Sequence, residues 1–109
     1  MPDLKHLDIQ VRRGKLDFQD KVGFSIEIEA LREISGKLKS LKEKESGCLQ
    51  LDYGNVTYIV RIIDNSDLVD FDDDIVITKI TKDCRIARVI PVTVIASILY
   101  NIGGKAYRE

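Results

Sequence analysis

The sequence holds few of the side chains that catalytic and redox sites commonly use. It has one histidine, His6, two cysteines, two prolines and no tryptophan, and aromatic residues make up 6% of the chain. Cys48 and Cys84 show no C-x-x-C spacing, and His6 is the only imidazole available to join them, so a zinc or redox motif has no support. We therefore predict two reduced, partly buried thiols and no catalytic residues.

A strong charge imbalance and a long hydrophobic run are also missing. The formal net charge is -1, with 44% hydrophobic and 32% charged residues, which is typical of a globular protein. The longest apolar stretch, residues 89–99, is too short to span a bilayer, and the N-terminal residues lack the apolar core of a signal peptide. We expect a cytoplasmic protein without membrane contact, built as one domain over residues 1–109 with a loose tail at 103–109.

Alternating apolar and polar residues predict strands in the first part of the chain. Residues 5–11 alternate with a period of two, and residues 22–29 show the same pattern most clearly. Between them, Leu16 and Phe18 allow a short return strand. The N-terminal part is therefore predicted to be β-structure with one apolar face.

The apolar spacing then changes to that of a helix. From Leu31 to Leu41, apolar residues recur every three or four positions, which places them on one side of a helix ending near residues 46–47. Gly36 works against this helix because glycine is unfavourable in a helix interior. A helix that starts just after Ser35, used as an N-cap, is the alternative.

Two hairpins follow. Residues 48–63 read as a pair of strands joined at Gly54-Asn55, which suits a two-residue primed turn. The β-branched segments within residues 75–90 predict a second hairpin. Pro91 then suits the first position of a helix that stops at Gly103.

The order of these elements is ββαββββα, and the connections are short. Such connections favour a mostly antiparallel sheet of about five to six strands with two helices packed on one face, which is an α+β fold. A small, partly closed barrel is the alternative. Neither architecture implies an activity, because function has to be argued from a site.

Acidic residues gather in one segment, DNSDLVDFDDD at residues 64–74, which holds six carboxylates in eleven positions. In an extended backbone Asp70, Asp72 and Asp74 point to the same side, and such an oxygen cluster suits Mg²⁺ or Ca²⁺. A standard calcium-binding loop that begins at Asp70 is excluded, because its sixth position must be glycine and this chain has Ile75 there. The alternatives to a metal site are a solvated loop and a surface for a basic partner.

Basic residues mark the candidate nucleic-acid surface. The positions that would carry electrostatic binding are Arg12, Arg13, Lys82, Arg85 and Arg88. The scarcity of aromatic residues weakens a model in which bases stack on the protein. Nucleic acid is therefore an alternative partner and not the expected one.

The second predicted helix carries more apolar surface than one sheet needs. A wide apolar face remains outside its narrow polar stripe, and we expect a homodimer interface at Val94, Ile95, Ile98 and Ile102. The sequence favours a small interaction or regulatory module that binds a partner without intrinsic catalysis. The first alternative is a divalent-metal-dependent phosphoryl-transfer or hydrolytic enzyme that uses residues 64–74, and the second is an electrostatic nucleic-acid binder.

Overall fold

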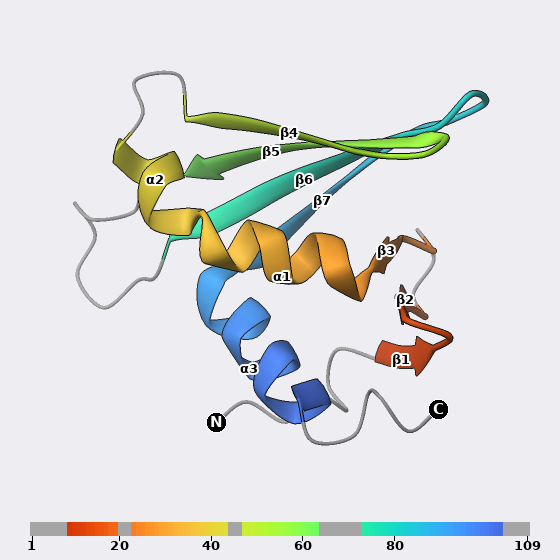
Figure 1. Cartoon of the computed structure of the whole chain (residues 1–109), viewed down its shortest axis with the longest axis horizontal. Coiled ribbons are helices and arrows are strands. Elements are labelled where there is room, and N and C mark those ends of the chain that lie inside the picture. Colours follow the sequence, from red (N-terminus) through yellow and green to blue (C-terminus); the bar gives the residue numbers. More distant parts are fainter. Residues whose placement is uncertain (1–8, 20–22, 44–46, 64–72, 104–109) are drawn as a thin grey trace. The chain divides into compact units, whose positions relative to one another are not determined.

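The computed structural model describes residues 9–19, 23–43, 47–63 and 73–103. These residues form an α+β fold with two antiparallel sheets, one of three strands and one of four, as Figure 1 shows. The chain divides into two compact units, one made of Met1–Ser35 with Thr93–Glu109 and the other of Gly36–Val92. The predicted α+β class and antiparallel pairing are confirmed, but the strands belong to two sheets instead of one.

The first unit begins with a small sheet of three strands. Strand β1 (Ile9–Arg12) pairs with β2 (Lys15–Phe18), and β2 pairs with β3 (Ser25–Glu27). The turn between β1 and β2 has positive φ at both central residues, 51° at Arg13 and 75° at Gly14, which is the pattern of a type I′ turn. The short return strand that the sequence allowed is therefore present as β2.

Helix α1 (Ile28–Gly36) starts earlier than the sequence predicted. The strand expected over residues 22–29 is limited to β3, because Ile28 also fits the helical spacing that continues through Leu31 and Ile34, and all three side chains are buried. The backbone N–H of Ile28 donates a hydrogen bond to the carbonyl oxygen of Gly14 at 2.9 Å. This bond satisfies one of the donors that a helix start leaves unpaired.

Gly36 ends α1, so the single long helix expected up to residues 46–47 is two helices. The second, α2 (Leu38–Glu43), belongs to the other unit, where it contacts strand β5 (Val56–Ile63). Helix α3 (Val92–Gly103) begins one residue later than predicted, because Pro91 is the last residue of a strand and not the first residue of the helix. Gly103, predicted to stop this helix, is its last residue.

The second unit contains the larger sheet. Its strands are β4 (Cys48–Tyr53), β5, β6 (Asp74–Ile80) and β7 (Arg85–Pro91), hydrogen-bonded in that order. Both predicted hairpins are confirmed. Gly54 has a φ of 63° in the β4–β5 turn, which suits the first central position of a type II′ turn. Among the described strands β4 and β7 are the two edges, so this sheet is open and not a closed barrel.

Candidate functional site

Strand alternation gives the four-stranded sheet two different faces. Because directly paired residues of an antiparallel sheet point to the same side, the register assigns each side chain to a face. One face, the covered face, carries the buried side chains of Leu51, Tyr58, Val60, Ile75, Ile77 and Ile90. The other, which we call the open face, carries Ile59, Ile63, Val76, Ile80, Ala87 and Val89.

The open face exposes apolar surface to water. Val89 is 56% exposed and Ile63 is 45% exposed, while Ile59, Val76 and Ile80 are half-buried. Val76 and Val89 are direct cross-strand partners, so the exposed surface continues from β6 to the edge strand β7. Polar side chains lie among them, since Arg61 is paired with Val76 and Thr78 with Ile59. Apolar side chains gathered on one exposed sheet face mark a candidate interaction surface.

Two opposite charges border the open face at one end. The register aligns Asp52 on β4, Thr57 on β5, Ile80 on β6 and Arg85 on β7 in one row across the sheet. The Asp52 carboxylate accepts hydrogen bonds on Oδ1 from Thr57 Oγ1 at 2.9 Å and from Gln50 Nε2 at 3.4 Å. These bonds fix an exposed carboxylate at one edge of the row, and the exposed Arg85 lies at the other edge.

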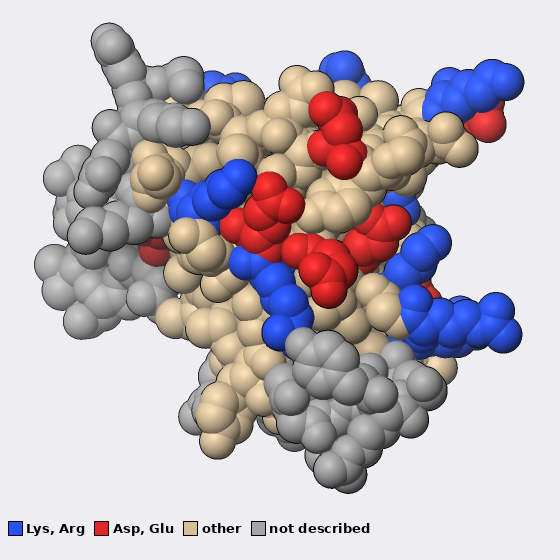
Figure 2. Space-filling model, viewed as in Figure 1, with Lys and Arg blue, Asp and Glu red and all other residues tan. Residues whose placement is uncertain are grey.

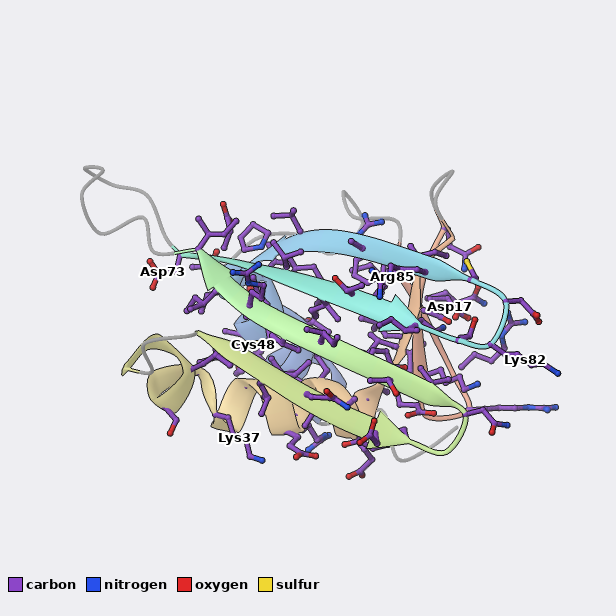
Figure 3. All side chains as sticks on the ribbon, turned by 90° about the horizontal axis from the view of Figure 1, so that it is seen from above. Asp17, Lys37, Cys48, Asp73, Lys82 and Arg85 are labelled. Atoms are coloured by element: carbon purple, nitrogen blue, oxygen red, sulfur yellow. The ribbon has the colours of Figure 1, made fainter. Side chains whose placement is uncertain are left out.

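The predicted nucleic-acid residues on the larger sheet do not form one surface. Lys82 lies in the turn at the tip of the β6–β7 hairpin, away from the end of the sheet that holds Asp73, as Figure 3 shows. Arg85 and Arg88 are three positions apart on β7, so strand alternation places Arg85 on the open face and Arg88 on the covered face.

The other predicted basic residues lie together on the β1–β2 hairpin. Arg12 and Arg13 line a hollow of about 470 Å³ with Lys15 and Asp17, and Figure 2 shows Lys and Arg side chains over this hairpin. The Arg12 guanidinium lies 3.5 Å from the Asp17 carboxylate. The hollow combines three cationic side chains with one carboxylate, and nucleic-acid binding there stays a prediction.

The acidic segment is described only at its end. Asp70 and Asp72 lie outside the described residues, whereas Asp74 is half-buried at the start of β6, paired with Ile63 and Pro91. The carbonyl oxygen of Asp73 accepts a hydrogen bond from the backbone N–H of Val92 at 3.0 Å. Within the described ranges, no three His, Cys, Asp or Glu side chains come together as a metal site. The Mg²⁺ or Ca²⁺ site therefore stays a prediction.

Helix α3 offers less apolar surface than the sequence suggested. Ile95 and Ile98, predicted at a dimer interface, are both 0% exposed within the single chain. Val94 is half-buried, and the side chain of Ile102 lies outside the described residues. Tyr100 is the most exposed large hydrophobic side chain described in this helix, at 73%.

The two cysteines differ from the sequence prediction in one respect. Cys48 and Cys84 are free thiols, as expected, but both are exposed and not partly buried. Cys48 lies on the open face at the start of β4, where strand alternation turns its side chain away from the covered face, and Cys84 precedes β7 outside the paired strands.

No helix in the described part of the chain is both long and apolar enough to cross a membrane.

Sequence reasoning missed the open face, although a signal for it was present. Residues 58–60 and 75–77 are uninterrupted apolar runs in β5 and β6, whereas a sheet with one solvated face shows apolar and polar residues in alternation.

Comparisons of the chain with protein families, curated protein sequences and solved structures find no match. Function is therefore argued from the geometry of the described residues.

Proposed function

We propose that this protein is a cytoplasmic interaction module that acts as a homodimer without catalysis of its own, and that the open face is its binding surface. The observation that carries the proposal is the exposure of Val89 and Ile63 on one face of a hairpin-built sheet.

The apolar runs in β5 and β6 support burial of both faces of the sheet. An antiparallel sheet with water on one side needs apolar residues only on the other side. Here residues 58–60 and 75–77 supply apolar side chains to both sides, yet Ile59 and Val76 are only half-buried in the single chain. Contact with a second copy would give the open face the cover that these side chains favour.

The interface proposed here lies on the larger sheet, whereas the sequence predicted it on helix α3. Ile95 and Ile98 are already buried in their own chain, so they have no surface left to offer a partner. On the larger sheet, in contrast, Ile63 on β5 and Val89 on β7 are exposed on the same face, and Val89 is paired with the half-buried Val76 of β6. Two copies of the same surface produce the closed two-fold assembly that is commonest among homo-oligomers.

The contribution of Val89 to the free energy of dimer formation follows from its exposed fraction. Burying a valine side chain completely contributes about 1.5 kcal/mol, and 56% of Val89 is exposed for a partner to cover. Covering that part in both copies contributes about 1.7 kcal/mol, which corresponds to about a 15-fold change in the dissociation constant. Val89→Lys adds the cost of bringing a charge into the interface, so its effect should exceed this value.

Analytical ultracentrifugation over a dilution series tests the proposal. We expect the wild-type protein to show a monomer–dimer equilibrium, Val89→Lys to raise the dissociation constant by more than about 15-fold, and Tyr100→Lys to leave it unchanged. Tyr100→Lys is the matched control, because it places the same charge on an exposed apolar residue of α3. A monomeric wild type at high micromolar concentration, or dissociation by Tyr100→Lys alone, would contradict the proposal.

A further inference from the structure

We propose, on the basis of the homodimer above, that two copies pack open face to open face about a two-fold axis parallel to the strands. In this arrangement Asp52 of each copy faces Arg85 of the other. These opposite charges then determine how the two copies are oriented, and they favour contact of the open face with the open face of a second copy. The proposal concerns only the larger sheet, whose register is described from β4 to β7.

The strand register explains why this axis pairs the charges. A two-fold axis that runs along the strands between β5 and β6 places β4 of one copy over β7 of the other, and it leaves each transverse row at the same height. Asp52 and Arg85 are the two ends of a single row. The rotation therefore exchanges their positions, and the dimer gains two equivalent contacts between opposite charges.

Asp52 and Arg85 cannot satisfy each other within one copy. Three inter-strand spacings separate β4 from β7, a distance of about 14 Å between the two backbones. Both side chains are exposed, and the carboxylate of Asp52 is held in place by Thr57 and Gln50. Packed sheets cross at about 30°, and the long arginine side chain can span the resulting offset at the sheet edge.

The same axis also determines the neighbours in the rest of the interface, where the exposed Arg61 lies opposite Val76 of the second copy. The row of Cys48, Arg61, Val76 and Val89 places Cys48 opposite Val89 of the second copy. An axis perpendicular to the strands would instead lay β7 over β7 of the second copy and bring Arg85 to the end that holds Pro91. That alternative leaves Asp52 and Arg85 on separate edges, so only the parallel axis uses both charges.

The area is close to that of a specific contact. The four strands hold six to eight residues each, and at about 3.3 Å per residue and about 4.8 Å per strand the flat area of the face is about 450 Å² per copy. The pair therefore covers about 900 Å². The side chains that project from the two faces add to this area and bring it near the roughly 1,000 Å² of specific protein interfaces.

Charge reversal tests the orientation directly. Asp52→Arg alone places two guanidinium groups together twice, and Arg85→Asp alone places two carboxylates together twice, so we expect each variant to dimerise about tenfold more weakly than wild type. In an equimolar mixture, every contact in the heterodimer again joins opposite charges. The mixture should therefore form heterodimers in preference to either homodimer, as measured by native mass spectrometry. Lys82→Asp, a charge reversal in the β6–β7 turn, is the control and should behave as wild type.

Chemical crosslinking provides a second measurement. Packed sheets lie about 10 Å apart, too far for a direct disulfide between facing residues, so a short bismaleimide reagent is needed to join two thiols. In a Cys84→Ser background, this reagent should link Val89→Cys to Cys48 of the other copy, and Cys48→Ser should abolish that covalent dimer. A monomeric wild type would overturn the homodimer itself. A dimer that Val89→Lys weakens, but that shows no heterodimer preference and no Cys48-dependent crosslink, would overturn the orientation alone.

Discussion

Replacing Ile77 with alanine should destabilise the fold far more than the same change at Ile59. Both isoleucines lie on central strands of the larger sheet, but Ile77 is on the covered face with 0% exposure and Ile59 is half-buried on the open face. The substitution removes three carbon atoms, which at about 0.8 kcal/mol each contribute about 2.4 kcal/mol when they are fully buried. The enclosed cavity left at Ile77 raises the expected loss to about 3–4 kcal/mol, whereas at Ile59 water enters and the loss should be about 1 kcal/mol.

Urea unfolding followed by circular dichroism measures both losses, provided that the slope with denaturant is unchanged. The measurement should be repeated at several protein concentrations, because dimer formation adds to the apparent stability. The loss of unfolding free energy in Ile77→Ala should not depend on protein concentration, because Ile77 is buried within the single chain. The loss in Ile59→Ala should increase with protein concentration, because a larger fraction of the protein is then dimeric. Equal losses at the two positions, independent of concentration, would refute the distinction between the two faces.

Two further predictions concern the smaller sheet and the acidic segment. Arg13→Asn should stabilise the protein by about 0.5–1 kcal/mol in urea unfolding, because Arg13 has a φ of 51° in a turn that favours Asn-Gly; no gain, or a loss, would show that Arg13 has contacts worth more than the strain. If Asp70, Asp72 and Asp74 bind Mg²⁺ or Ca²⁺, millimolar concentrations of the ion should raise the melting temperature above that of an ionic-strength control. A shift equal to the control would remove the metal site and the enzyme hypothesis built on it.

The hairpins were predictable because their signals are local. The β4–β5 hairpin follows from apolar residues around Gly54, the glycine that accepts the positive φ of the turn. The start of α1 was missed because Ile28 satisfies two patterns, the alternation of the preceding strand and the three-residue spacing toward Leu31. Local sequence does not decide between such patterns, since the packing of the whole unit determines which one forms.

The division into two sheets and the identity of the exposed face were harder to predict. Strand pairing over long sequence distances is not encoded in any short stretch, so the sequence could not assign β3 and β4 to different sheets. Where both faces of a strand are apolar, as at residues 75–77, the pattern does not say which face meets water. The burial of Ile95 and Ile98 within the single chain could not be predicted for a related reason. A wide apolar helix face is equally expected in a helix that its own chain covers and in one that a partner covers.

The arrangement of the two units along the chain has a consequence for biosynthesis. The unit of Gly36–Val92 is a continuous segment, so all of its strands have been translated before residues 93–109 follow. The other unit combines Met1–Ser35 with Thr93–Glu109, and it remains incomplete until helix α3 has emerged from the ribosome. Because chains fold progressively during synthesis, all strands of the larger sheet become available for pairing before helix α3 can complete the other unit.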